Sequence, residues 1–213
     1  MTWSAIGSPV VANNIHGASD TFNATPTTLG NILVLVGGTA VGNPSGYQVS
    51  GFGVTTWDIV PLPGTGIGVL AIAFGVITST GTQSGTVTGF GGIDATIQEF
   101  NPPSGLVSID VYADSSYTAV SSGVIASVSP TSTNELYVGG VVNGIATASF
   151  SGSGGGFTYV ANLLSMMIYE TNVATPSSYS PAWADANGPS NYTTQGVCLM
   201  TPAPGTNSSQ MIL

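Results

Sequence analysis

The strongest structural signal in the chain is the stretch TPTTLGNILVLVGG, residues 25–38. Its first part is a polar turn sequence with Pro26 and Gly30, and its second part is a run of Ile, Leu and Val that ends at Gly37 and Gly38. Branched apolar residues favour β-strands, whereas Pro and Gly favour turns. The stretch therefore predicts a buried strand that is entered through a tight turn.

A second stretch, SPTSTNELYVGG at residues 129–140, repeats this arrangement with a short offset. Each stretch is a polar turn that leads into an apolar strand. We hypothesise that the two strands occupy equivalent places in the two halves of a sandwich. Duplication and the general sequence pattern of strands both account for the likeness.

Short apolar or alternating runs separated by Gly, Pro, Asn and Ser continue along the whole chain, and no helical period is present. The expected strands cover residues 31–36, 47–54, 56–60, 68–77, 85–88, 95–100, 107–112, 123–128, 135–142, 157–162, 165–173 and 195–201. About a dozen strands predict an all-β, antiparallel two-sheet sandwich of the jelly-roll-like kind. At 213 residues we expect one domain over residues 1–200 and a C-terminal extension over residues 201–213.

The charge of the chain excludes several classes of partner. There is no Lys or Arg, and nine acidic residues give a formal net charge of -9. Binding to nucleic acid or to an anionic membrane surface needs cationic side chains, so neither is expected. Only 4% of residues are charged, and such a surface suits a subunit that buries much of itself against neighbours. We expect a homo-oligomer; the alternative is a secreted monomer of low charge.

The N-terminus lacks the features of a secretion signal, and the longest apolar run, residues 66–77, is shorter than a membrane-spanning helix. We therefore expect no export by the general secretory route and no membrane insertion. Cys198 is the only cysteine and lies in an apolar strand sequence, which indicates a buried, unreactive thiol.

Several short motifs, in their order along the chain, resemble jelly-roll domains of the concanavalin-A-like sandwich type, which occur in bacteriophage structural proteins and in some secreted bacterial surface proteins. The motifs lie at residues 30–34, 55–57, 97–100, 134–140 and 156–158, and the likeness covers about residues 20–200. The resemblance implies a virion component, such as a capsid decoration or minor tail protein, or a glycan-binding module. The chain departs from most of these relatives because it has no basic residue.

Catalytic chemistry is not indicated. The nine carboxylates are scattered singly, and the Glu-x-Asp-x-x-Glu motif of concanavalin-A-like glycosidases is absent. Glu99 is either a solvated strand residue or a residue that faces a groove. A serine triad would depend on His16, the only histidine, and zinc would need more His and Cys ligands than the chain has. We therefore predict that the protein is not an enzyme and has no resident cofactor.

Two kinds of binding site remain open. Calcium prefers hard oxygen ligands, and Asp110 with Asp114 is the candidate pair; a solvated turn is the alternative. Sugar rings stack on aromatic faces, and the candidate contacts are Trp57, Trp183, Tyr47 and Tyr192. Such aromatic residues beside turns also commonly cover a core.

The sequence thus predicts a non-enzymatic virion structural protein, made in the host cytoplasm, that decorates a bacteriophage capsid or tail surface. It would act by self-association and by docking on other virion proteins. A carbohydrate-binding module that attaches to surface glycan is the first alternative, and a secreted glycan hydrolase is the second.

Overall fold

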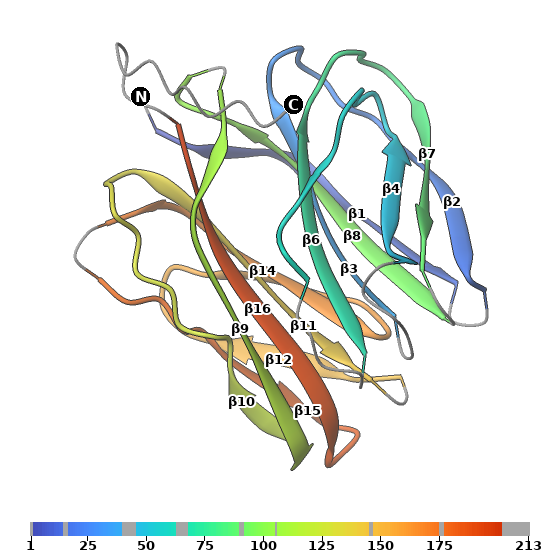
Figure 1. Cartoon of the computed structure of the whole chain (residues 1–213), viewed down its shortest axis with the longest axis vertical. Helices are drawn as coiled ribbons and strands as arrows, with labels where there is room; N and C mark the ends of the chain where they lie inside the picture. The colour runs from blue at the N-terminus through green and yellow to red at the C-terminus, as the bar shows by residue number, and fades with distance from the viewer. Residues whose placement is uncertain are drawn as a thin grey trace.

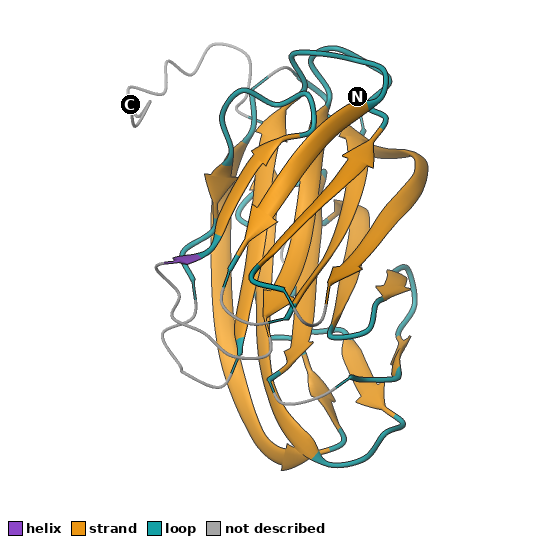
Figure 2. Ribbon diagram, turned by 90° about the vertical axis from the view of Figure 1, so that its right-hand side faces the viewer, coloured by secondary structure: helices purple, strands orange, loops and turns teal. Residues whose placement is uncertain are grey.

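The structure is a computed structural model that describes residues 2–14, 17–39, 46–62, 68–89, 92–104, 106–144, 147–174 and 177–201. These residues form sixteen strands and no α-helix; the short purple segment in Figure 2 includes a 3₁₀ turn at Gly46 (Figures 1 and 2). His16 and residues 202–213 of the expected C-terminal extension lie outside the described residues.

The strands divide evenly between an N-terminal and a C-terminal half. The first half contains β1 (Ser4–Asn14), β2 (Ser19–Ala24), β3 (Ile32–Thr39), β4 (Gln48–Gly51), β5 (Asp58–Ile59), β6 (Val69–Val76), β7 (Gln83–Thr88) and β8 (Ile93–Asn101). The second half contains β9 (Ser108–Val120), β10 (Ser122–Val124), β11 (Glu135–Asn143), β12 (Phe150–Ser153), β13 (Thr158–Ala161), β14 (Ser165–Val173), β15 (Ala182–Asp185) and β16 (Ser190–Met200).

The two halves have the same topology. The first half forms the sheets β1-β8-β3-β6-β5 and β2-β7-β4, and the second forms β9-β16-β11-β14-β13 and β10-β15-β12. When the strands are numbered from one to eight within each half, both halves read 1-8-3-6-5 and 2-7-4. All the strand pairs are antiparallel. Eight antiparallel strands in two sheets make a jelly roll. The all-β, jelly-roll-like prediction is confirmed, and the predicted two-sheet unit occurs twice.

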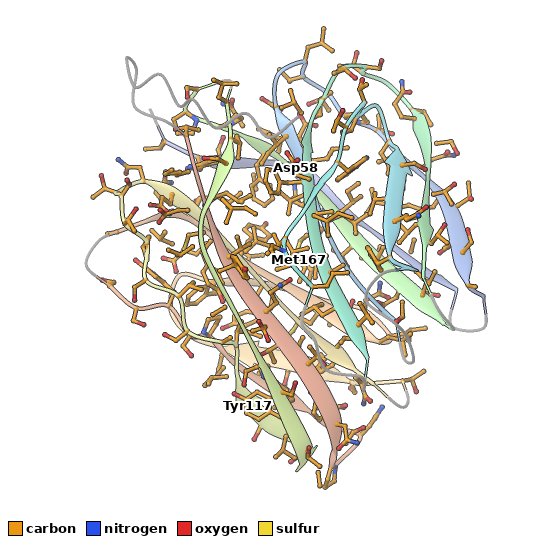
Figure 3. The ribbon with its side chains drawn as sticks, in the orientation of Figure 1. Asp58, Tyr117 and Met167 are labelled. Carbon is orange, nitrogen blue, oxygen red and sulfur yellow. The ribbon has the colours of Figure 1, made fainter. Side chains whose placement is uncertain are left out.

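Three hydrophobic cores hold four layers of sheet together. One core lies inside the first jelly roll and includes Leu35, and another lies inside the second and includes Tyr137. The third core joins the two five-stranded sheets and contains Val34, Val138 and Met167. Figure 3 shows Met167 between the blue-to-green half and the olive-to-red half. Because both faces of the five-stranded sheets are covered, their central strands β3 and β11 are buried along their whole length.

The two similar sequence stretches occupy equivalent places, as hypothesised. They form β3 and β11, which are the central strands of the two five-stranded sheets. Their glycines let the two sheets approach each other closely. A Cβ atom on Gly140 would lie 2.7 Å from Val36 Cγ1, and a Cβ atom on Gly38 would lie 2.9 Å from Val142 Cβ. The Val-Gly-Gly sequence is therefore used twice at the junction between the halves.

Candidate functional site

Two of the predicted sugar contacts, Trp183 and Tyr192, lie in the core of the second jelly roll. They are 2% and 1% exposed, and their ring centroids are 4.5 Å apart. Trp183 also meets Tyr117 edge-on at 5.7 Å (Figure 3). The Tyr192 hydroxyl donates to Asp185 Oδ2 at 2.9 Å, and burial, followed by this carboxylate, raises the pKa of Tyr192. The two rings pack against other rings rather than against solvent, which corrects their assignment as ligand contacts.

Tyr47 requires the same correction. It is buried in the core of the first jelly roll. Its hydroxyl lies where a Cβ atom on Gly37 would have to be, so the ring packs directly on the backbone of β3. Burial, and secondarily the Asp94 carboxylate, raises the pKa of Tyr47. The ring has no face available to a sugar.

Trp57 is the one predicted aromatic contact that keeps a partly exposed side chain. Its Nε1 donates to the Gly51 carbonyl at 3.3 Å, and its ring meets Phe52 edge-on at 6.2 Å. Beside it in the chain, Thr56 and Asp58 line a surface cavity of about 260 Å³ (Asp58 is labelled in Figure 3). This region combines an aromatic side chain with hydroxyl and carboxylate groups.

The predicted calcium pair is not brought together. Asp110 and Asp114 are four residues apart on β9, which corresponds to roughly 13 Å along an extended strand. The Asp110 carboxylate accepts the backbone N–H of Thr131 at 2.6 Å and its hydroxyl at 2.5 Å. Asp114 is exposed. Within the described ranges, no three His, Cys, Asp or Glu side chains form a cluster of metal ligands.

Asp110 instead lies beside Glu135, at the start of β11. Glu135 is 1% exposed and accepts the backbone N–H of Ser132 at 2.7 Å. Burial, and secondarily the Asp110 carboxyl, raise the pKa of Glu135 to about 7, against the lowering effect of the Ser132 N–H. Two neighbouring carboxyl groups without a cation are most stable when one of them is protonated. This pair therefore ties β9 to the turn before β11.

Asp94 joins the two halves. It lies on β8 and is fully buried, and its Oδ2 accepts the backbone N–H groups of Leu164 at 2.7 Å and of Ser165 at 2.8 Å. Ser165 is the first residue of β14 in the other half, and Leu164 precedes it. Burial raises the pKa of the Asp94 carboxyl to about 6, although the hydrogen bonds from Ser165 and Leu164 favour its charged form. The strand β16 holds the place in the second half that β8 holds in the first. It carries Gln195, whose Nε2 donates to the carbonyl of Pro61 at 2.7 Å and so also joins the two halves.

Two further carboxylates, Glu99 and Asp185, also hold turns, and this structural role was not predicted from the sequence. Glu99 is 6% exposed and accepts hydrogen bonds from Thr27 N at 2.8 Å and from Asn31 Nδ2 at 2.6 Å. It fixes the turn before β3, so the solvated interpretation of Glu99 is wrong. The groove interpretation is confirmed, because Glu99 also lines a surface pocket of about 170 Å³ together with Thr27.

Asp185 has the same role in the second half. It accepts hydrogen bonds from Ser149 N, Asn187 N, Tyr192 Oη and Asn143 Nδ2. Burial acts to raise the pKa of Asp185, but the hydrogen bonds together lower it below its ordinary value.

The Cys198 thiol is fully buried on β16. Burial raises the pKa of this thiol, and the nearby Glu135 and Asp110 carboxyls raise it further. A thiolate is the reactive form of cysteine, so this residue is held in its unreactive form.

The outer face of the sheet β10-β15-β12 is shallowly concave and uncharged. Ala184 is paired with Ser122 on one side and with Ser151 on the other, and Ala182 is paired in the same way with Val124 and Ser153. The residues of these three strands line a shallow cavity of about 420 Å³. The residues that line it are small or carry hydroxyl groups, apart from Val124 and the largely buried Trp183, and none of them is charged.

No helix in the described residues has the length and apolar character needed to cross a membrane. A scan against protein-family models, a search of curated proteins and a search of solved structures found no match. The function therefore has to be inferred from the geometry of the chain itself.

Proposed function

We propose that this chain is a non-enzymatic structural protein of a virus particle, most specifically a bacteriophage capsid- or tail-surface subunit. It acts by self-association and by docking on other virion proteins. The jelly roll is a fold of both capsid and lectin domains, so the assignment to a virion rests on analogy of fold and on the sequence resemblance.

The observation that carries the proposal is the use of the carboxylates. Asp94, Glu99, Asp110 and Asp185 each accept backbone N–H groups that fix a turn or join the two halves. General acid–base catalysis needs carboxyl groups that point at a substrate. In this chain these groups are part of the architecture, which supports a structural role.

The surface supports the same role. A chain with no Lys or Arg presents hydroxyl, amide and small apolar groups to its neighbours, and the face of β10-β15-β12 is an example. Such groups pack against another protein without the cost of removing charges from water. The net charge of -9 also opposes adhesion to nucleic acid during assembly.

The test is the mass of the purified chain in solution, measured by light scattering at neutral pH over a concentration series. The proposal expects a discrete oligomer that persists on dilution. A chain that stays monomeric up to about 0.2 mM would have a dissociation constant weaker than that of a typical specific complex. This result would remove self-association from the proposal.

A carbohydrate-binding module is the second candidate, and the region around Trp57 favours it. Trp57 has a partly exposed indole, and its chain neighbours Thr56 and Asp58 line a cavity; together they match a sugar site in composition, although Trp57 itself is not among the residues that line the cavity. Glycan-array binding that is lost in Trp57→Ala and retained in Trp3→Phe, a buried control, would support this candidate. An array without hits for the wild-type protein would reject it.

A further inference from the structure

The strands at the sheet edges differ greatly in their capacity to pair with another chain. An edge strand carries a row of backbone N–H and C=O groups that another strand can use, and short edges are a natural protection. The edge strands β2, β4, β5, β10, β12 and β13 are two to six residues long. The long edges are β1, with 11 residues, and β9, with 13 residues. These two strands hold equivalent positions in the two halves.

The β1 edge is obstructed at two places along its length. Pro9 lacks a backbone N–H, Gly7 has a φ of 66°, and the pairing with β8 shifts register between Ile6 and Val10. Farther along, the side chain of Asn162 donates to the carbonyl of Ala12 at 3.0 Å. Bulges and proline are known devices that protect an edge from pairing.

The β9 edge has neither device in its central part. The strand contains no Pro and no Gly, and Val111 to Ser115 pair in regular register with β16 on one side. In the sheet order of the described residues, no strand lies beyond β9 on its other side. Tyr112, which is 45% exposed, and the exposed Asp114 both belong to this segment.

We infer that the open edge of β9 pairs antiparallel with β9 of a second copy of this chain, so that two five-stranded sheets become one continuous sheet. The inference rests on the self-association in the proposed function and names the surface that performs it. Backbone hydrogen bonds supply the affinity in such strand addition. Because each chain offers one open long edge, the contact closes at two copies and does not grow into a fibre.

The side chains select the register. Pairing centred on Ala113 places Tyr112 of each copy opposite Asp114 of the other, where the phenol hydroxyl donates to the carboxylate. The chain has no cation to neutralise Asp114, so a hydroxyl donor is the best group that a second copy offers. Pairing centred on Tyr112 would instead place Asp114 opposite Asp110, and like charges directly opposite each other are destabilising.

A charge series at position 112 tests both the surface and the register. Tyr112→Glu places two acidic pairs across the contact and is expected to weaken dimerisation by about tenfold or more, whereas Tyr112→Lys places Lys opposite Asp114 and is expected to keep a dimer that weakens as salt is added. The matched control is Val11→Glu, because Val11 is 44% exposed and holds the equivalent position on β1. It is expected to leave the mass unchanged.

The measurement is light scattering of the full chain, with circular dichroism to verify that each variant is folded. The expected wild-type mass is twice that of the 21.2 kDa chain. An oligomer that Tyr112→Glu does not weaken, or that Val11→Glu weakens equally, overturns the β9 contact and leaves the proposed function standing. A wild-type monomer overturns the contact together with the self-association on which it rests.

Discussion

Acidification from pH 8 to pH 5 is expected to stabilise this protein, because two buried carboxyl groups hold their protons more tightly in the folded state than in the unfolded chain. Asp94 has its pKa raised from 3.8 to about 6, and Glu135 has its pKa raised from 4.5 to about 7. At pH values between the unfolded and folded pKa, the folded protein binds more protons, so the free energy of unfolding falls as the pH rises. The stabilisation is complete below about pH 4 and is lost by about pH 7.

The magnitude follows from the size of these differences. About two pKa units at Asp94 correspond to about 3 kcal/mol as an upper value. The contribution of Glu135 is discounted to about 1–2 kcal/mol, because the neighbouring Asp110 carboxylate and its donor Thr131 lie close to solvent, where water screens the charges. Repulsion within a chain of net charge -9 acts in the same direction.

Urea unfolding at pH 5, 6, 7 and 8 measures the effect directly. Asp94→Asn keeps an oxygen acceptor for Leu164 N and Ser165 N but cannot ionise. Between pH 5 and pH 8 its stability is therefore expected to change by about 1.4 kcal/mol less than that of the wild-type protein. His16→Asn serves as a control, because it removes the only histidine. A wild-type protein that gains stability as the pH rises from 5 to 8, or an Asp94→Asn variant with an unchanged pH dependence, would refute this reasoning.

Three further predictions concern packing and burial. Gly38→Ala is expected to cost about 1–3 kcal/mol in urea unfolding, because the new Cβ would lie 2.9 Å from Val142 Cβ; Gly155→Ala, in open space, is expected to be nearly neutral. Asp185→Ala is expected to cost about 3 kcal/mol or more, because it leaves the donors that this carboxylate satisfies without a partner. The Cys198 thiol is expected to react with a thiol reagent only in denaturant, and rapid reaction of the native protein would contradict its burial.

The strands that the sequence predicts well are those buried on both faces. The central strands β3 and β11 have long apolar runs, because each lies between two hydrophobic cores. The strands β1, β2, β12 and β15 were not predicted. They are edge strands or parts of the outer sheets, and their sequences contain Gly, Pro or polar residues because one side of each strand is free of packing. A periodicity argument has little signal where burial is slight.

The likeness of the two halves was visible in the sequence of only one pair of strands, because that pair is buried on both faces. The Val-Gly-Gly sequences of β3 and β11 are kept where the two sheets touch, since a Cβ atom at Gly38 or Gly140 would collide with the opposite half. The outer strands have no such constraint, so β2 and β10 share position but not sequence. Topology therefore shows the repeat more clearly than the sequence does.

The candidate sites were the least predictable part, because their outcome depends on residues that are distant in the chain. Whether an aromatic residue beside a turn faces solvent or a core is decided by the opposite sheet, as Tyr47 and Trp183 show. The role of Glu99 is decided by Thr27, which is 72 positions away. No local pattern around Glu99 contains that contact.

The equivalence of the two halves also predicts how one buried hydroxyl behaves. Thr96 lies opposite Val36 on β3, and Val197 lies opposite Val138 on β11, so Thr96 and Val197 hold equivalent positions. Thr96 is fully buried, and its hydroxyl has no hydrogen-bond partner in the part of the chain that the structure describes. Such a hydroxyl costs free energy because it loses its contact with water.

Replacing Thr96 with the residue that the other half uses, Thr96→Val, is therefore expected to stabilise the protein by about 1 kcal/mol in urea unfolding, because the two side chains have the same shape. Thr193→Val is the matched opposite case. The Thr193 hydroxyl donates to the Gly68 carbonyl at 3.2 Å, so its removal is expected to cost about 1 kcal/mol. If both variants are destabilised to the same extent, the Thr96 hydroxyl has a hydrogen-bond partner, and Thr96 and Val197 are equivalent in position only. If Thr96→Val is stabilised and Thr193→Val is destabilised, valine, the residue of the second half, is the more stable choice at this position.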